Sequence, residues 1–215
     1  PANNTTLKKW MKKALSAHPD HIKIIRLTVT SGESSRWVGV PGKPQVVLIV
    51  SPHELPPKPF KLHVSEFKVD QKSVFRIIKT LSYAIHAAAL KQARALGCDD
   101  ALMLNENNQV AEVTSANIYW VRKNRIYTPP IGSGCLEGVT RKIVLNESKK
   151  LGFKVAERNG NLETLLEADE IFISSSLKLV VGVNHIKIGR KTHKIRTGPV
   201  TDAFAGHFKR MVGLQ

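Results

Sequence analysis

The stretch that decides the fold is SYAIHAAALKQARALGCDDALMLN, residues 82–105, because two kinds of periodicity meet in it. Its first part is rich in alanine and other strong helix formers, and Gly97 follows as a C-cap, which predicts a helix. The residues DDALMLN (99–105) then predict an apolar strand. NENNQ (105–109) has the composition of a turn and predicts a hairpin into VAEVTSANIYWVRK (110–123).

Further helices and strands are predicted on both sides of this stretch. Helical spacing and composition predict helices at 5–17, 138–152, 161–168 and 198–212. Alternating or apolar runs predict strands at 21–30, 45–50, 61–70, 124–130, 153–158 and 169–176, and strand and turn over 179–195. Because helices and strands do not alternate strictly, the sequence favours the α+β class. Its texture changes near residue 75, which predicts a smaller N-terminal part (1–74) and a larger C-terminal domain (75–215).

Composition and charge narrow the class of protein. The chain has 215 residues, with 33 Lys and Arg, 17 Asp and Glu, a formal charge of +16 and 42% hydrophobic residues, which indicates a globular protein. Cys98 and Cys135 cannot form a disulfide scaffold and match no zinc spacing, which favours a reducing compartment such as the cytosol. No run approaches the roughly 20 apolar residues of a membrane helix, and the first residues do not resemble a signal peptide. The charge leaves nucleic acids, acidic lipids and small anionic ligands open as partners.

Lys79 is the first candidate for chemistry. It stands between an apolar, strand-like run at 74–78 and the alanine-rich helix. A lysine at the end of a buried strand is partly desolvated, which lowers the pKa of its amine and makes the neutral form available as a nucleophile or base. The alternative is a solvated lysine at a helix start, which is the common case in a chain so rich in lysine.

Glu112 is the second candidate, because it falls in VAEVTSAN, where a hairpin strand is expected to be apolar. A buried carboxylate would need a cation or hydrogen-bond donors beside it. The alternative is a surface glutamate on the exposed face of the strand.

Two polar stretches are candidates for binding anions. In LEGVTR (136–141), Gly138 precedes a predicted helix whose first turn holds Thr140, so free amides and a hydroxyl could bind an anion. The alternative is an ordinary helix start. The serines SSS (174–176) gather hydroxyls and amides at the end of an apolar strand, and the alternative there is a polar turn.

The order of these four features resembles the class IV pyridoxal-phosphate aminotransferase family, also called fold type IV. That family includes branched-chain aminotransferases, D-amino acid aminotransferases and 4-amino-4-deoxychorismate lyase. The resemblance runs from about residue 22 to residue 201, and the stretches that carry it are KTLSY, EVTSANIYWV, IYTPP, LEGVTR, LLEADEIFISSSL and GPVT. It implies the fold of these enzymes, pyridoxal 5'-phosphate as cofactor, a small substrate with one or more carboxylates, and a homodimer.

The resemblance assigns roles to the first group of residues. Lys79 matches the lysine that forms a Schiff base with the cofactor and later moves a proton. Glu112 matches the carboxylate that pairs with the pyridine nitrogen and keeps the ring protonated, so that the ring can accept electrons. Asn117 belongs to the same motif and is expected to support a turn. Tyr83 is a candidate partner for the ring hydroxyl of the cofactor.

The remaining matches concern the phosphate and the substrate. By resemblance, the phosphate would be held by the amides and hydroxyl of Val139 and Thr140, with Gly138 allowing close approach and Ser176 adding a hydroxyl. The substrate carboxylate would be met by three further residues, Ser175, Leu177 and Arg36.

The residues after the serines bear on the reaction. In D-amino acid members a histidine stands two positions after the arginine that Arg36 matches, and here that position is Val38. Aminotransferases commonly continue as A-x-E-[IV]-x-P-V, whereas this chain reads LKLVVGV (177–183). The pair Ser176–Leu177 is more similar to 4-amino-4-deoxychorismate lyase, which yields 4-aminobenzoate and pyruvate in folate biosynthesis. We therefore expect that lyase reaction, with a branched-chain or D-amino acid aminotransferase as the alternative.

One part of the family pattern is not found in this sequence. Members carry an N-terminal segment with a G-D-G-x-F-E-like stretch and an HxxRL-like helix whose arginine binds the phosphate, and neither motif occurs here. The resemblance therefore predicts an incomplete small domain, and reduced cofactor affinity if nothing replaces that segment.

An interpretation from another class is a basic nucleic-acid-binding module. Its support is the net charge together with KKWMKK (8–13) and GRKTHKIRTG (189–198). Against it, the sequence has no zinc spacing, helix-turn-helix or RNA-recognition aromatic motif. We therefore expect neither a nucleic acid nor a membrane as partner, and a family member without catalytic activity is the closer rival to an enzyme.

Overall fold

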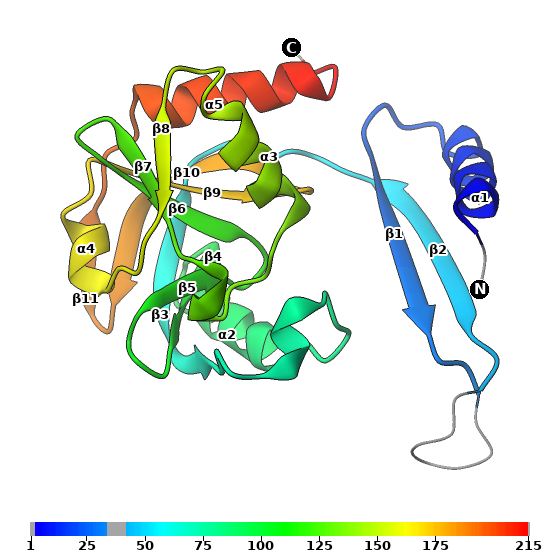
Figure 1. Cartoon of the computed structure of the whole chain (residues 1–215), viewed down its shortest axis with the longest axis horizontal. Coiled ribbons are helices and arrows are strands. Elements are labelled where there is room, and N and C mark those ends of the chain that lie inside the picture. The colour runs from blue at the N-terminus through cyan, green and yellow to red at the C-terminus, as the bar shows by residue number, and fades with distance from the viewer. Residues whose placement is uncertain (1–2, 34–41, 215) are drawn as a thin grey trace. The chain divides into compact units, whose positions relative to one another are not determined.

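The computed structural model describes residues 3–33 and 42–214. The chain divides into two compact units, Pro1–Leu55 and Pro56–Gln215 (Figure 1). The change in sequence pattern near residue 75 predicts a boundary between residues 74 and 75, later than the boundary between Leu55 and Pro56. The boundary lies earlier because strand β3 (Phe60–Val69) belongs to the sheet of the second unit, where it pairs with β4 and β10.

The first unit is a small helix–hairpin arrangement. Helix α1 (Asn4–Ser16) is capped by the side chain of Asn3, which accepts from the amide of Thr6. Strands β1 (Lys23–Thr30) and β2 (Gln45–Pro52) form a two-stranded antiparallel sheet, and α1 packs against β2. Residues 34–41, which include Arg36, lie outside the described part of the chain.

The second unit contains a nine-stranded mixed sheet. Besides β3, its strands are β4 (Asp100–Asn105), β5 (Val110–Val113), β6 (Asn117–Arg122), β7 (Arg125–Thr128), β8 (Lys154–Glu157), β9 (Glu170–Ser175), β10 (Leu179–Ile188) and β11 (Lys191–Lys194). The order is β5-β4-β3-β10-β9-β6-β7-β8, and β11 pairs with β10. A bridge between Val113 and Ala116 joins β5 back toward β6, so the sheet curls. The mixture of parallel and antiparallel pairs confirms the predicted α+β class.

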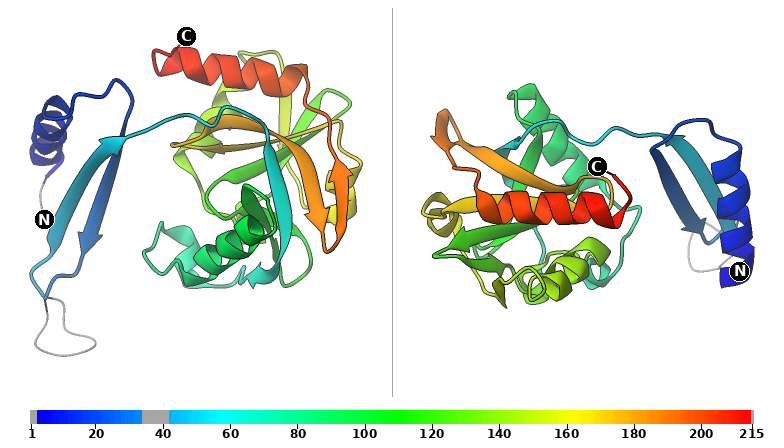
Figure 2. Two further views of the ribbon diagram at one scale, coloured as in Figure 1. Left: turned by 180° about the vertical axis from the view of Figure 1, so that it is seen from behind. Right: turned by 90° about the horizontal axis from the view of Figure 1, so that it is seen from above.

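Helices cover this curled sheet. They are α2 (Ala84–Ala95), α3 (Val139–Glu147), α4 (Leu162–Leu166) and α5 (Pro199–Met211), with short 3₁₀ helices η1 (Val74–Ile77) and η2 (Ile131–Ser133). Helix α2 packs on β3 and β4, and α5 packs on β9 and β10 (Figure 2). Small residues let α2 lie close to the sheet, because Ala89 and Ala93 are fully buried against Met103. None of the described helices is long and apolar enough to span a lipid bilayer.

Three predicted elements differ from the structure. The predicted strand at 110–123 is two strands, because Asp100 accepts hydrogen bonds from the amide and hydroxyl of Thr114 and from the Ser115 hydroxyl and so holds a turn between them. The predicted helix at 138–152 ends with α3 at Glu147. The predicted strand-like run at 74–78 is the 3₁₀ helix η1.

Candidate active site

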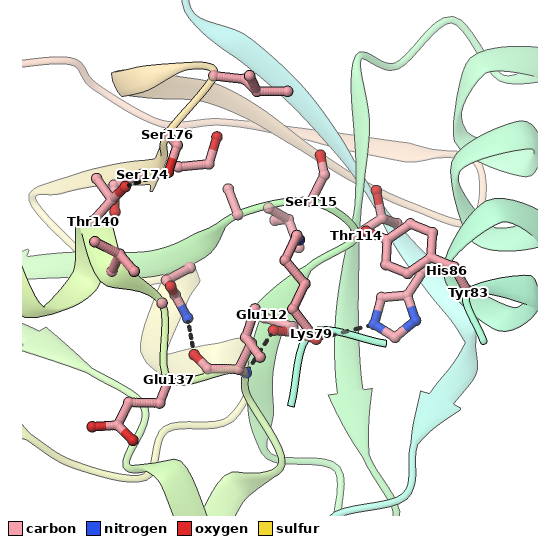
Figure 3. Close-up of a pocket in the computed structure, with 18 of the residues that line it drawn as sticks. Lys79, Tyr83, His86, Glu112, Thr114, Ser115, Glu137, Thr140, Ser174 and Ser176 are labelled. Carbon is pink, nitrogen blue, oxygen red and sulfur yellow. Dashed lines mark hydrogen bonds and ion pairs between the residues drawn. The ribbon is translucent and has the colours of Figure 1, made fainter. Parts of the chain in front are cut away.

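A pocket of about 350 Å³ lies within the second unit. Its walls come from four segments that are distant in sequence: the chain from η1 into α2, the β5–β6 turn, the bend that enters α3, and the β9–β10 turn. Figure 3 shows Lys79 between two groups of polar side chains, one around Glu112 and the other around Thr140 and Ser176. We call the first group, Arg76, His86 and Glu112, the carboxylate end. We call the second group, Gly138, Val139, Thr140 and Ser176, the donor end.

Glu112 is the centre of the carboxylate end. Strand β5 places its side chain inside the pocket with only 5% of the residue exposed. Arg76 Nη2 and His86 Nε2 both contact Oε1, the latter at 3.0 Å, and the amide of Leu136 donates to Oε2 at 2.9 Å. Of the two alternatives for Glu112, the structure therefore shows the buried carboxylate with hydrogen-bond partners and not the surface glutamate. These partners come from three segments of the chain.

Tyr83 and His86 lie side by side at the start of α2. Their rings stack with centroids 4.8 Å apart and an angle of 18° between the planes. Burial raises the pKa of the Tyr83 hydroxyl, and the carboxylates of Glu112 and Asp100 raise it further. The Tyr83 phenol thus stays neutral through the physiological range and can donate a hydrogen bond into the pocket.

Lys79 follows η1 rather than a buried strand, and it is exposed, which corrects the predicted desolvation at a strand end. The segment before it is itself open to solvent, since Val74 and Phe75 are 73% and 60% exposed. Lys79 nevertheless lines the pocket, and Figure 3 shows its side chain between the two ends. Its amine is therefore accessible to a molecule that occupies the pocket.

The donor end is built around the start of α3. Gly138 is the N-cap, and no side chain in the described ranges caps this helix, so the amides of its first turn lack intrahelical partners. Thr140 is buried, and its hydroxyl lies 3.4 Å from that of Ser176 on the β9–β10 turn. Amides at a helix N-terminus and converging hydroxyls form a site suited to an anion.

Asn117 and Gly138 interlock at the bend that leads into α3. Asn117 is buried at the start of β6, and its Nδ2 donates to the Leu136 carbonyl at 2.8 Å. A Cβ atom on residue 138 would lie 2.3 Å from Oδ1 of Asn117. The bend thus requires glycine because the amide of Asn117 occupies the space that a side chain would need.

The β9–β10 turn adds both buried and exposed residues to the wall of the pocket. Ser174 is buried and its hydroxyl lies 2.9 Å from that of Tyr119, whereas Ser176 and Leu177 are exposed. The Ser175 hydroxyl accepts from the amide of Lys178 at 3.2 Å. The turn therefore presents main-chain and hydroxyl groups along one side of the pocket.

A second lysine stands beside the pocket. Lys178 Nζ donates to the Ser115 hydroxyl at 2.5 Å and lies 3.6 Å from Asp100 Oδ2. Burial lowers the pKa of Lys178, while Asp100 opposes that effect. Because Asp100 is itself almost fully buried, this group of charges holds the β5–β6 turn in place.

The structure brings nearly all the predicted site residues together. One pocket is lined by Lys79, Tyr83, Glu112, Asn117, Gly138, Val139, Thr140, Ser175, Ser176 and Leu177. Arg36 lies outside the described residues. Sequence reasoning missed Arg76, His86 and Ser115, which also line the pocket. The available signals were weak: Arg76 stands three positions before Lys79, and His86 lies on the face of a helix that is otherwise mostly alanine.

Comparison with known proteins identifies the family. The model of the amino-transferase class IV family matches residues 1–186, so the chain belongs to this family. A putative branched-chain-amino-acid aminotransferase from Methanocaldococcus jannaschii is 31% identical over 194 residues, which cover 86% of this chain and 66% of that protein. The aligned region covers only 53% of a probable branched-chain-amino-acid aminotransferase from Rickettsia bellii, which is 29% identical. The chain thus spans two thirds or less of these curated relatives.

Solved structures agree on the fold. The branched-chain aminotransferase of Thermoproteus uzoniensis with norvaline superposes with a TM-score of 0.90 at 26% identity, covering 99% of this chain and 72% of that one. A putative 4-amino-4-deoxychorismate lyase from Legionella pneumophila gives 0.89 at 22% identity, covering 97% and 77%. A branched-chain aminotransferase from Thermobaculum terrenum in its PLP form gives 0.71 at 27%, covering 80% and 59%. The curled mixed sheet is therefore the fold of the fold-type-IV pyridoxal-phosphate enzymes, which confirms the expected fold.

Proposed function

We propose that the pocket binds pyridoxal 5'-phosphate and that the protein acts on the Cα of a small substrate carrying an amino group and a carboxylate. The observation that supports this most directly is the convergence of Lys79, Glu112 and Thr140 on one pocket, with the amine between a buried carboxylate and an anion site. Membership of the class IV family and a relative solved in its PLP form add to it.

The residues present fit this cofactor. Helix amides and the hydroxyls of Thr140 and Ser176 are suited to its phosphate, because they offer donors without a competing carboxylate among themselves. Glu112 accepts two contacts on Oε1 and one on Oε2, which leaves one of the roughly four acceptor positions of a carboxylate for a ring N–H. Bound pyridoxal phosphate supplies an aldehyde that condenses with amines and a ring that accepts an electron pair.

Different residues of the chain have different roles in this proposal. Lys79 holds the cofactor through its amine and, once free, is the base that moves the proton at the substrate Cα. Glu112 holds the ring nitrogen, and Tyr83 donates from its neutral phenol. Main-chain amides of the turn at Ser175 and Leu177 receive the substrate carboxylate, and Arg36 is proposed to assist from outside the described residues.

Amino transfer is the reaction we place first. Two curated relatives that are 31% and 34% identical to this chain are named as a putative branched-chain-amino-acid aminotransferase and a branched-chain-amino-acid aminotransferase. The mouth of the pocket also carries apolar side chains that suit an aliphatic substrate, since Ile78, Val139 and Leu177 line it and are 54%, 74% and 46% exposed.

The lyase reaction on 4-amino-4-deoxychorismate is the second candidate. It is favoured by the local sequence Ser176–Leu177 at the substrate-facing turn, which departs from the aminotransferase pattern. The same turn would then receive one carboxylate of a substrate that carries two. For either reaction we propose a homodimer in the cytosol, which sedimentation analysis and cell fractionation would test.

The decisive experiment is cofactor trapping on the full chain. With pyridoxal phosphate added, we expect a visible absorbance band, and after borohydride reduction we expect the modified peptide in a mass spectrum to contain Lys79. Lys79→Ala should lose both signals, while Lys91→Ala, which changes an exposed lysine on α2, should keep them. A protein that stays colourless and unmodified would contradict the proposed function.

A substrate test separates the two reactions. Transfer of the amino group of leucine or norvaline to 2-oxoglutarate would support the aminotransferase. Release of pyruvate from 4-amino-4-deoxychorismate without an amino acceptor would support the lyase. Each assay needs the Lys79→Ala variant as its blank.

A further inference from the structure

The carboxylate end contains a cation that the family resemblance does not assign. Arg76 comes from η1, and its Nη2 contacts Oε1 of Glu112. Its Nε donates to the Gly134 carbonyl at 2.6 Å, so two edges of the guanidinium are fixed at once. The side chains of Arg76 and Glu112 are 20% and 7% exposed, which places this ion pair largely out of water. Charge-assisted hydrogen bonds are strongest in such surroundings.

His86 shares the same carboxylate oxygen. Its Nε2 lies 3.0 Å from Oε1 of Glu112, and its ring is held from one side by the stack with Tyr83. An ionised carboxylate can only accept hydrogen bonds, so Nε2 must carry a proton in this arrangement. Oε1 therefore has two donors, and Oε2 has the Leu136 amide and one free acceptor position.

We propose that Arg76 is a positioning residue that acts through Glu112. It fixes the carboxylate and takes up part of its negative charge. A ring nitrogen paired with Glu112 therefore holds its proton less firmly than it would if Glu112 had no ion pair with Arg76. The inference rests on the proposed binding of pyridoxal phosphate in this pocket. It adds to that function a residue that sets how strongly the ring is protonated.

The physical reason is a competition between two cations for one anion. A protonated ring nitrogen on Oε2 and the guanidinium on Oε1 are like charges held close together by the same carboxylate. A like charge at this range disfavours the protonated form of a titrating group, typically by one or more pKa units. Because the ring accepts electrons best when protonated, Arg76 would moderate the electron-accepting capacity that the pocket gives its cofactor.

A merely structural role for Arg76 is the rival explanation. Its bond to Gly134 joins η1 to the segment that leads into α3, so the residue also ties two walls of the pocket together. Loss of that tie would lower stability or cofactor affinity, but it would not raise the pH at which a bound ring loses its proton. The protonation of the ring is therefore the readout that separates the two roles.

The test uses the full chain loaded with pyridoxal phosphate labelled with ¹⁵N in the ring, and follows the ¹⁵N chemical shift against pH. For Arg76→Met we expect the ring proton to be lost at a pH about one unit higher than in the unmodified protein, which is about a tenfold change in its dissociation constant. Arg76→Lys keeps the positive charge and should titrate close to the unmodified protein. Arg122→Met removes an arginine from a surface pair with Asp169 and should leave the curve unchanged.

Three results would overturn the inference. If Arg76→Met titrates like the unmodified protein, or loses the ring proton at lower pH, then Arg76 does not draw charge away from the ring. If Arg76→Met does not fold, Arg76→Gln, which is neutral but keeps hydrogen-bond donors, must show the same upward shift, and its absence is equally negative. If the unmodified protein binds no labelled cofactor, the proposed function fails first and this inference falls with it.

Discussion

The two ends of the pocket handle charge in opposite ways. At the carboxylate end, Arg76 and Glu112 bring full charges into a mostly dry environment, where each has a partner before any ligand arrives. At the donor end, the hydroxyls of Thr140 and Ser176 and the amides of α3 are neutral, and the charge they are suited to bind belongs to the ligand.

This difference determines when each end contributes. A buried ion pair costs much free energy if one member is removed, because the other is left as an uncompensated buried charge. A set of neutral donors costs little when one is removed from the free protein, because water replaces the missing partner. We therefore expect changes at the carboxylate end to affect folding itself, and the loss of a hydrogen-bond donor at the donor end to appear mainly when an anion is bound.

Glu112→Ala should give the largest effect. It leaves Arg76 and His86 without their shared partner, so the free energy of unfolding of the cofactor-free protein should fall by about 3 kcal/mol. Urea denaturation would measure this. Glu112→Gln keeps one acceptor oxygen and should cost less. A Glu112→Ala protein as stable as the unmodified one would show that the ion pair contributes nothing to folding and would remove the contrast between the two ends.

Gly138→Ala should give the next largest effect. It tests whether the backbone bend of the uncharged donor end is held rigidly in place. The new Cβ would meet Oδ1 of Asn117 at 2.3 Å, so Asn117 must move and give up its bond to the Leu136 carbonyl. The cost of a broken buried hydrogen bond is about 1–3 kcal/mol. The bend would shift with it, and affinity for pyridoxal phosphate should fall about tenfold or more, as equilibrium dialysis can show.

A double-mutant cycle gives the control for this clash. In an Asn117→Ala background the obstructing oxygen is gone, so Gly138→Ala should cost clearly less there than in the unmodified protein. If the two losses simply add, the alanine is harmful for a reason other than its contact with Asn117.

Much of the donor end could be predicted from the sequence, because its parts are local. Gly138, Val139 and Thr140 are neighbours in the chain at a helix start, and a helix start exposes amides wherever it occurs. The alanine-rich helix and most strands could also be predicted from the sequence, since composition and periodicity are local properties. The predicted end of the α3 helix was wrong, because the apolar spacing continues beyond Glu147 although the helix ends there.

The carboxylate end could not be worked out in the same way, because its parts are distant in sequence. Arg76 and Glu112 are separated by 36 positions, and neither shows by spacing or composition that it meets the other. Asp100 similarly breaks the predicted 110–123 strand through bonds to Thr114 and Ser115, 14 and 15 residues away. The local sequence marked Glu112 as a candidate and the resemblance gave it a role, but its contacts with Arg76 and His86 required the folded structure.

Thr140→Val should have a smaller effect that appears only with ligand. It removes a buried hydroxyl while keeping the shape of the side chain, and a hydrogen bond to a charged group contributes about 1.5–3 kcal/mol. Affinity for pyridoxal phosphate should fall about tenfold, whereas the stability of the free protein should change little. Ser176→Ala should lose less, because Ser176 is exposed, and Thr192→Val on β11 is the matched control. A large loss of stability without ligand would mean that Thr140 supports the fold rather than an anion site.

The half-buried Tyr83 and the fully buried Tyr119, one near each end, allow the smallest effect to be measured. Burial raises the pKa of both Tyr83 and Tyr119. Near Tyr83 the carboxylates of Glu112 and Asp100 add to that rise. Near Tyr119 the hydrogen bond with Ser174 and the charge of Arg141 act against it. Charge therefore reinforces burial at one end and opposes it at the other.

Glu112→Gln should consequently lower the pKa of Tyr83 and leave that of Tyr119 unchanged. Ultraviolet titration of tyrosinate, in Tyr119→Phe and Tyr83→Phe backgrounds respectively, would separate the two curves. The folded protein keeps both phenolic protons above the ordinary tyrosine pKa of about 10, so their contribution to stability is complete below that pH and is lost as the pH rises through the folded pKa. Equal shifts of both tyrosines would mean that the charge of Glu112 reaches across the whole pocket, and the two ends would then be one electrostatic unit instead of two.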